Sequence, residues 1–319
     1  MLRSFLIYLS KAAWAQNIVM NMKLAWRVAS RFVAGTTIES AVNAARELNA
    51  RGINATMDHL GENITTLEEA RQACQDVLDL LDQISCCDVS ANVSIKLTQM
   101  GLAIDEGLCL ENVERILERA RQYNNYLRVD MEDTPYTDLT IDVVRKMRAK
   151  GYENVGIAIQ SYLYRSEADV RALLEEGFRF RLIKGAYKEP SDKAYPKKAD
   201  VDANFDNLAK IMMDWSLAHG APTLSGHGRI PPIPAFGTHD TARVEFAKKY
   251  AAQIGLPKEA LEFQMLYGIR RDLQEQCAAE GYPVRIYIPY GTHWYPYFMR
   301  RLAERPANLW FFISNLFRK

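Results

Sequence analysis

The chain alternates between short apolar runs and longer stretches in which apolar residues recur every three or four positions. The short runs are typical of buried parallel strands, and the longer stretches are typical of helices that pack on one face. Eight strands are predicted, over Ile53–Met57, Asn92–Leu97, Leu127–Met131, Val155–Ile159, Arg179–Lys184, Ala235–Thr238, Leu261–Leu266 and Val284–Ile288. A predicted helix follows each strand, over Leu67–Ile84, Leu110–Tyr123, Thr137–Lys150, Glu167–Glu176, Asp200–His219, Asp240–Ile254, Asp272–Gly281 and Tyr295–Arg305.

This alternation predicts an α/β protein that forms a (β/α)8 TIM-like barrel, with extra N-terminal helices and a C-terminal helix. The extra helices are predicted over Ala12–Phe32 and Thr37–Arg51. Thr36 and Glu39 have the spacing of a capping box at the start of the second. We therefore expect a helical arm over residues 1–51 and a catalytic barrel over residues 52–319, in a single domain overall.

Bulk properties narrow the class of protein. The 40 basic and 39 acidic residues leave a net charge of +1, without the clustered basic excess of a nucleic-acid-binding protein. The five cysteines are odd in number and scattered, which fits reduced thiols in the cytoplasm. No run approaches the roughly 20 apolar residues of a membrane-spanning helix. We expect a cytoplasmic protein whose membrane contact, if it has one, is peripheral at the inner face.

Polar residues follow nearly every predicted strand. Catalytic groups of a (β/α)8 barrel lie at the carboxyl ends of its strands, so these residues predict a functional mouth there. They are Asp58, Glu62, Lys96, Asp130, Glu132, Gln160, Lys184, Thr238, His239, Gln264 and Tyr287.

The last predicted helix has an unusual polar face. Tyr297, Arg300, Arg301 and Glu304 are spaced so that they share one side of the helix. Two adjacent arginines can bind a carboxylate with paired, charge-assisted hydrogen bonds. The pattern therefore indicates a site for a small anion beside a flat ring. The alternative is an ordinary solvated face, since charged residues of both signs are common on surface helices.

The predicted fifth strand places two arginines in a buried setting. By alternation Arg179 and Arg181 point to the same side, and a buried arginine demands an anionic or strongly polar partner. The alternative is that both close the bottom of the barrel through mutual salt bridges. Gly185, just beyond, allows a ligand to approach the backbone closely. Lys184 also admits a Schiff-base aldolase.

A second cluster, Thr238-His239-Asp240, stands where a strand meets a helix start. Amide groups at a helix start favour phosphate, which indicates a phosphate-bearing cofactor. Alternatively, Asp240 simply caps the helix. No histidine pair has metal-binding spacing, and neither G-x-G-x-x-G nor a P-loop is present. Such a cofactor would therefore be held in the barrel mouth. Residues 221–234, rich in Gly and Pro, predict an irregular loop before the sixth strand.

Several stretches, in the same order along the chain, resemble proline dehydrogenase, the FAD-dependent barrel enzyme, in its short bacterial single-function form. They are Val93–Leu97, Arg128–Asp133, Gln160–Ser166, Arg181–Tyr187, Thr238–Asp240, Glu262–Arg271 and Tyr297–Glu304. Because they run along most of the chain, the resemblance is specific. It implies that the barrel binds FAD.

The resemblance also implies roles for individual residues. Arg181, Lys96 and Asp130 would be catalytic, with Arg181 beside flavin N5. Substrate would be bound by Lys96, Asp130, Tyr187, Leu266, Tyr287, Tyr297, Arg300, Arg301 and Glu304. FAD would be bound by Asp130, Gln160, Arg181, Ile183, Lys184, Gly185, Ala186, Tyr187, Thr238, His239, Asp240, Arg301 and Glu304. No metal is expected.

The reaction implied by this resemblance is oxidation of L-proline to 1-pyrroline-5-carboxylate by hydride transfer to flavin N5. Electrons would pass to a membrane quinone, and a separate pyrroline-5-carboxylate dehydrogenase would oxidise the product. Two alternatives stay open: a Schiff-base aldolase that uses Lys184, and a non-catalytic, degenerate barrel.

Overall fold

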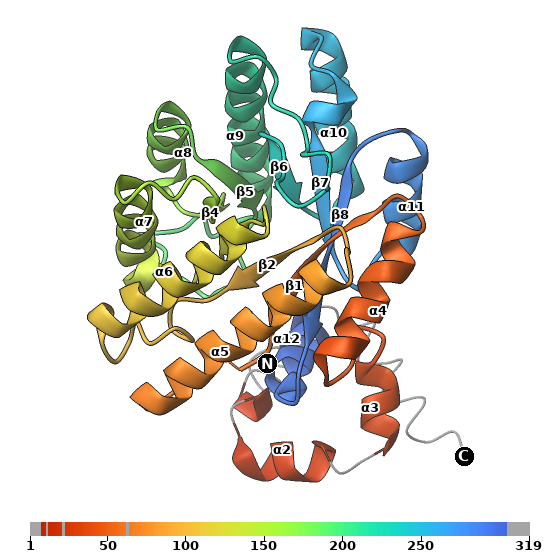
Figure 1. Cartoon of the computed structure of the whole chain (residues 1–319). Coiled ribbons are helices and arrows are strands. Elements are labelled where there is room, and N and C mark those ends of the chain that lie inside the picture. The colour runs from red at the N-terminus through yellow and green to blue at the C-terminus, as the bar shows by residue number, and fades with distance from the viewer. Residues whose placement is uncertain (1–7, 11, 21–22, 62–63, 305–319) are drawn as a thin grey trace.

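The computed structural model describes residues 8–10, 12–20, 23–61 and 64–304. Its strands form a closed parallel barrel in chain order, which confirms the predicted (β/α)8 fold (Figure 1). The strands are β1 (Asn54–His59), β2 (Ala91–Ile95), β3 (Leu127–Val129), β4 (Val155–Gln160), β5 (Arg179–Ile183), β6 (Ala235–Gly237), β7 (Glu262–Leu266) and β8 (Val284–Tyr290). We call the end of the barrel where these strands finish the mouth, and the opposite end the floor.

Helices surround the barrel as the sequence pattern predicts. They are α2 (Ala13–Met20), α3 (Lys23–Ala29), α4 (Ile38–Asn49), α5 (Leu67–Cys86), α6 (Glu106–Gln122), α7 (Thr134–Ala149), α8 (Ser166–Glu175), α9 (Lys198–Ala218), α10 (Thr241–Ile254), α11 (Arg271–Ala279) and α12 (Trp294–Glu304). A 3₁₀ turn, Lys258–Ala260, precedes β7.

The N-terminal segment differs from the prediction in two respects. The helix expected over residues 12–32 is described as α2 and α3, with residues 21–22 outside the described residues, and α3 already ends at Ala29. The cap of α4 is Thr37 instead of Thr36, and its Oγ1 accepts a hydrogen bond of 3.2 Å from the Ser40 amide. Ser40 completes the capping box, so Glu39 is left as an acidic residue in the first turn.

The main hydrophobic core lies between the strands and the surrounding helices. It includes α4, whose Ala41, Ala45 and Leu48 are buried against the barrel. The division into an arm over residues 1–51 and a barrel over residues 52–319 stays a prediction. Within the described part of that arm, α4 shares the core of the barrel.

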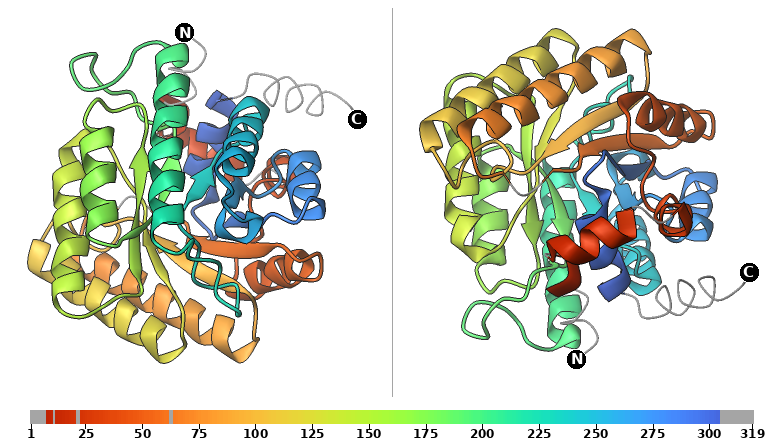
Figure 2. Two further views of the ribbon diagram at one scale, coloured as in Figure 1. Left: turned by 90° about the horizontal axis from the view of Figure 1, so that it is seen from above. Right: turned by 90° about the horizontal axis from the view of Figure 1, so that it is seen from below.

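A second, separate hydrophobic cluster lies at the mouth. It joins residues of α2 and α3 to Trp294, Phe298 and Leu302 of α12, together with Leu60 and Ile269 from the ends of β1 and β7. Figure 2, in the view from below, shows α12 and α2 lying across this end of the barrel. The N-terminal helices therefore cover the helix that carries the two adjacent arginines.

The Gly- and Pro-rich loop over residues 221–234 closes the floor. Arg229, which is buried, donates to the carbonyl oxygens of Val89 at 3.3 Å and Tyr123 at 3.1 Å, just ahead of β2 and β3. Arg285 donates to the Gly228 carbonyl at 2.7 Å and forms a fully buried ion pair with Glu262 at 3.0 Å. The loop thus fills the end of the barrel opposite the mouth.

The structure also shows where the two arginines of β5 lie, either of which could have faced a polar partner or closed the floor of the barrel. Arg179 lies there and donates to the Pro231 carbonyl at 2.6 Å. Arg181, two residues further along β5, pairs with Asp130 near the mouth. The expectation that both would close the bottom of the barrel through mutual salt bridges is therefore wrong.

Candidate active site

A buried polar cluster centres on Asp130, which directly follows β3. The guanidinium of Arg181, from β5, donates to Asp130 Oδ1. The hydroxyl of Tyr287, from β8, donates to Asp130 Oδ2 at 2.7 Å. The Arg181 guanidinium carbon also lies 5.4 Å from the centre of the Tyr287 ring, within the range of a cation–π contact. Three strands that are not neighbours in the sheet therefore meet at one carboxylate.

The charges around this carboxylate keep it ionised. Burial is the largest influence and by itself would raise the pKa of Asp130. Arg181 and Lys96, with hydrogen bonds from Tyr287 and Ser94, outweigh burial and hold the pKa of Asp130 below its usual value. Burial, then Asp130 and Asp58, raise the pKa of Tyr287 well above its usual value. Tyr287 therefore stays protonated and acts as a hydrogen-bond donor.

Lys96 has a second carboxylate beside it. Its Nζ lies 3.3 Å from Oδ2 of Asp58, and the Asp58 side chain is only 2% exposed. Asp58 ends up next to Lys96 because β1 and β2 pair in parallel with Asp58 opposite Ser94. The sequence pattern marks Asp58 as a polar residue at a strand end but indicates no role for it. Parallel pairing of β1 with β2 was the signal that could have predicted an ion pair between Asp58 and Lys96.

The neighbouring strands β4 and β5 each carry a buried polar atom that lacks a hydrogen-bond partner among the described residues. Gln160 is buried and its Nε2 donates to the Met131 carbonyl at 3.4 Å. Within the described residues, neither Gln160 Oε1 nor Arg181 Nε has a hydrogen-bond partner. Gly185 follows at φ +108°, where a Cβ would overlap the Tyr162 ring. Buried, unpaired polar atoms beside such a turn are what a bound polar ring would satisfy.

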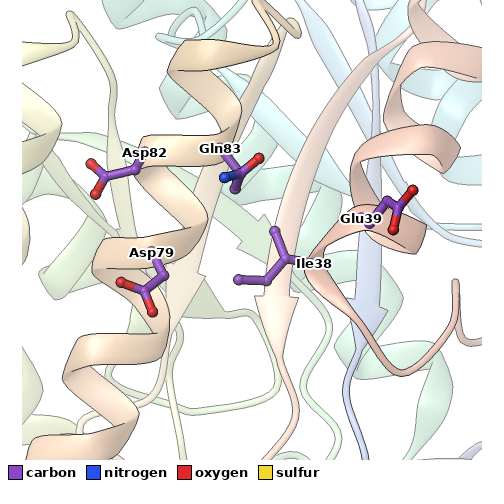
Figure 3. Close-up of a pocket in the computed structure, with 5 residues that line it drawn as sticks. All are labelled: Ile38, Glu39, Asp79, Asp82 and Gln83. Atoms are coloured by element: carbon purple, nitrogen blue, oxygen red, sulfur yellow. The ribbon is translucent and has the colours of Figure 1, made fainter.

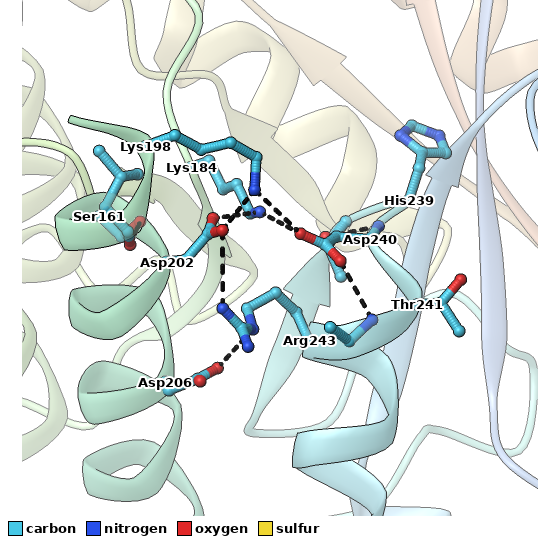
Figure 4. Close-up of polar contacts among 12 residues, drawn as sticks. Ser161, Lys184, Lys198, Asp202, Asp206, His239, Asp240, Thr241 and Arg243 are labelled. Atoms are coloured by element: carbon cyan, nitrogen blue, oxygen red, sulfur yellow. Dashed lines mark hydrogen bonds and ion pairs between the residues drawn. The ribbon is translucent and has the colours of Figure 1, made fainter.

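Figure 4 shows a charge network at the start of α9 and α10. Lys184 Nζ lies 2.5 Å from Asp202 Oδ1 and 2.6 Å from Asp240 Oδ2, and Lys198 also pairs with Asp202. Arg243 Nε lies 2.9 Å from Asp206 Oδ1. Two carboxylates thus occupy the Lys184 amine, whereas a Schiff-base lysine must present a free amine to the carbonyl carbon of its substrate. This pairing disfavours the aldolase alternative.

The Thr238-His239-Asp240 cluster is held by the backbone around it. Asp240 caps α10 by accepting from the Ala242 amide at 3.0 Å, as the capping alternative expected. Thr238 Oγ1 accepts from the Asp240 amide at 3.1 Å. His239 Nε2 accepts from the Leu266 amide at 2.9 Å, which requires the tautomer with its proton on Nδ1. His239 thereby joins the end of β6 to the end of β7.

Helix α12 brings the adjacent arginines to the mouth. Tyr297 is buried, Arg300 and Arg301 are half-buried, and the Arg301 guanidinium carbon lies 5.3 Å from the centre of the Tyr297 ring. Glu304 is the last residue of α12, and its side chain lies outside the described residues. Among the remaining predicted residues, Ile183, Lys184, Ala186 and Leu266 are half-buried or exposed, and Tyr187 is 38% exposed.

A separate cleft lies between α4 and α5, with a volume of about 550 Å³ (Figure 3). It is lined by Ile38, Glu39, Asp79, Asp82 and Gln83. Asp82 already pairs with Arg119 at 2.5 Å. None of the predicted site residues lines this cleft, and no metal-binding group of His, Cys, Asp and Glu occurs in the described part of the chain. The strand ends at the mouth are therefore the better candidate for an active site.

Comparisons with known proteins identify the family of the chain. The family model described as proline dehydrogenase matches residues 41–313. Proline dehydrogenase 2 of Bacillus subtilis is 37% identical over 99% of both chains. Proline dehydrogenase of Deinococcus radiodurans is 40% identical over 92% of this chain and 91% of its own. Proline utilization A from Bdellovibrio bacteriovorus, inactivated by N-propargylglycine, shares the fold with a TM-score of 0.77 at 24% identity, over 88% of this chain and 33% of its own.

Proposed function

The chain belongs to the proline dehydrogenase family, whose members are oxidoreductases acting on CH–NH donors, and on that premise we propose its reaction in full. It oxidises L-proline to 1-pyrroline-5-carboxylate with FAD as cofactor and passes the electrons to a membrane quinone. The observation that carries the proposal is the buried Arg181–Asp130–Tyr287 cluster beneath a helix with two adjacent arginines. A separate pyrroline-5-carboxylate dehydrogenase would then oxidise the product.

The residues at the ends of β4 and β5 fit a flavin. Gln160 Oε1 and Arg181 Nε are a buried acceptor and a buried donor on neighbouring strands, and neither has a hydrogen-bond partner in the part of the chain that the structure describes. A flavin ring carries both hydrogen-bond donors and acceptors along its edge. Bound FAD would supply the electron acceptor, taking a hydride at N5 from the proline carbon next to nitrogen. Arg181 would place its positive charge beside that edge, where it stabilises the reduced ring.

The rest of the cofactor would lie along the strand ends. The turn after β5 would let it approach the backbone, and the start of α10 would face its phosphates. Lys184 would contribute a cation there, balanced by Asp202 and Asp240. The proposed FAD-binding residues are Asp130, Gln160, Arg181, Ile183, Lys184, Gly185, Ala186, Tyr187, Thr238, His239, Asp240, Arg301 and Glu304.

Proline would bind between this surface and α12. Arg300 and Arg301 would hold its carboxylate, because two adjacent guanidiniums can donate paired hydrogen bonds to both oxygens. Tyr187, Leu266, Tyr287 and Tyr297 would form apolar walls for the pyrrolidine ring. Lys96, Asp130 and Glu304 would complete the polar lining. In this arrangement the chain's own residues orient the substrate and set the charge around it.

The test is the visible absorbance spectrum of the purified protein before and after anaerobic addition of L-proline. We expect a two-banded flavin spectrum that bleaches with proline and not with D-proline. A flavin that stays oxidised would move the substrate elsewhere while keeping the cofactor. A colourless protein that gains no flavin spectrum when FAD is added would refute the proposal, and borohydride trapping on Lys184 would then favour the aldolase.

A further inference from the structure

Tyr162, just after β4, packs on the turn that follows β5. It is buried, and its ring lies so close to Gly185 that a Cβ there would come within 2.4 Å of the ring. Its amide donates to the Lys184 carbonyl at 3.0 Å, and the Ser161 amide donates to the Ile183 carbonyl at 2.7 Å. The pairing of β4 with β5 therefore continues past the strand ends and joins Tyr162 to the start of the turn.

The hydroxyl group of Tyr162 holds the far side of the same turn. It accepts a hydrogen bond from the backbone amide of Tyr187. It also donates to Oε1 of Glu189, at 3.4 Å. Burial first, and then the charge of Glu189, raises the pKa of Tyr162, so the hydroxyl keeps the proton that it donates. One hydroxyl thus ties the backbone of Tyr187 to the side chain of Glu189.

Glu189 is itself fixed from a third strand end. Its carboxylate accepts from the Thr134 amide at 2.9 Å and from the Thr134 hydroxyl at 2.5 Å. Thr134 begins α7, the helix that follows β3. The first amides of a helix have no partner within the helix, so the carboxylate satisfies one of them and lies at the positive end of the helix dipole. The turn after β5 is therefore braced against the ends of β3 and β4.

The braced turn carries residues of the proposed active site. Gly185 and Ala186 are proposed to contact FAD, and Tyr187 is proposed to contact both FAD and proline. Gly185 has φ +108°, and a glycine gives the backbone more freedom than any other residue. Tyr187 is 38% exposed, so burial contributes little to fixing its position. Hydrogen bonds to the backbone of the turn therefore matter for its conformation.

We propose that Tyr162 and Glu189 are positioning residues, which hold residues 185–187 in the conformation that binds FAD and forms a wall for the proline ring. This inference rests on the proposed function, because that function gives the turn its ligands. Neither residue is among the proposed FAD or proline contacts, so both act through the backbone at Tyr187. When the turn leaves the binding conformation, affinity falls in proportion to the fraction of molecules still in it. Loss of the Tyr162 hydroxyl therefore weakens the binding of both ligands.

A purely structural role for Tyr162 makes a different prediction. Its ring belongs to a small hydrophobic cluster with Leu163 and Ala194, and its carbonyl accepts from the Tyr195 amide at 2.8 Å. Tyr162→Phe keeps the ring and this backbone contact and removes only the hydroxyl. If packing were the whole role of Tyr162, this variant would bind FAD and proline as the wild type does.

The test compares Tyr162→Phe with Tyr164→Phe in the FAD-loaded protein. Tyr164 is the matched control, because it lies two residues on, is 45% exposed and donates from its hydroxyl to the Ser191 carbonyl at 3.0 Å. FAD release on dilution, followed by flavin fluorescence, should give a dissociation constant about three- to tenfold higher in Tyr162→Phe, the effect of one net hydrogen bond. KM for L-proline should rise by a similar factor while kcat stays within about twofold. Tyr164→Phe should leave all three values within about twofold of the wild type.

Hydrogen exchange gives a readout that does not depend on activity. Peptides that cover residues 185–189 should take up deuterium faster in Tyr162→Phe and in Glu189→Gln than in the wild type or in Tyr164→Phe. Glu189→Gln leaves the Tyr162 ring in place and provides the same comparison where Tyr162→Phe does not fold.

The outcomes separate this inference from the proposed function. Equal exchange, FAD release and KM in Tyr162→Phe and Tyr164→Phe would overturn the positioning role alone. A wild-type protein that holds FAD but does not reduce it with proline would overturn the proposed substrate, whereas FAD release would still decide the positioning role. A wild-type protein that binds no FAD would overturn the proposed function and this inference with it.

Discussion

Replacing Asp130 with asparagine tests the centre of the proposed active site. The substitution keeps the shape of the side chain but removes the charge that pairs with Arg181 and accepts from Tyr287 at 2.7 Å. Breaking a buried ion pair by removing one partner costs about 3–5 kcal/mol. Asparagine can still accept one hydrogen bond, so we expect about 2–3 kcal/mol of lost transition-state stabilisation. This corresponds to a fall in kcat/KM for proline of about 30- to 150-fold.

The assay is proline-dependent reduction of a soluble dye, measured across substrate concentrations with the FAD content of each variant determined. Asp138→Asn is the matched control, because Asp138 forms an exposed pair with Arg165 and its side chain is 81% exposed. That variant should lose less than about 0.5 kcal/mol of stability and no activity. An Asp130→Asn protein with full FAD content and kcat/KM within twofold of wild type would refute the reasoning.

Three further predictions follow from the same contacts. Arg301→Lys should raise KM for proline by at least about tenfold, because lysine cannot donate paired hydrogen bonds to a carboxylate; unchanged kinetics would sink that assignment. Gly268→Ala should raise KM and weaken the packing of the segment just after α3, because a Cβ at residue 268 would overlap the Arg31 carbonyl oxygen. Gly255→Ala is the matched control: Gly255 has a similar φ but open space around it, so this variant should cost only about 1 kcal/mol of stability. The pKa of Asp130 is lowered in the folded protein, so the stabilising effect of its charge is complete above about pH 4 and is lost as the pH falls further. The free energy of unfolding, measured against pH, should therefore fall less steeply below about pH 4 in Asp130→Asn than in the wild type, and the two slopes should agree above it.

The barrel could be predicted because each strand is a buried apolar run whose character does not depend on its neighbours. Val284–Ile288, for example, was expected as a strand and is contained in β8. The mouth followed from geometry alone, since parallel strands finish at the same end. That reasoning placed Asp130 and Tyr287 at one end of the barrel, whereas the place of Arg181 beside them was implied only by the family resemblance.

The hydrogen-bond and ion-pair partners of individual side chains could not be predicted, because they depend on contacts between residues far apart in the chain. Asp58 meets Lys96 only when β1 pairs with β2. The cap at Thr37 differs from the expected Thr36 by one residue, because neighbouring threonines offer the same hydroxyl and only the backbone conformation selects one. Nor did any local pattern indicate that residues 221–234 would fill the floor, since that role depends on Arg229 and Arg285 reaching distant carbonyl groups.

The two separate hydrophobic clusters give the molecule two cooperative units of unequal strength. The main core ties the strands to their surrounding helices. Among the described residues, the smaller cluster at the mouth ties α12 to the short α2 and α3, to Phe32 and Val33 just after α3, and to the ends of β1 and β7. Small units with few buried contacts open at lower free energies than the global unfolding transition. On warming, amides of α12 should exchange with deuterium before those of the strands. Catalysis should then be lost, and regained on cooling, at temperatures where the barrel is still folded.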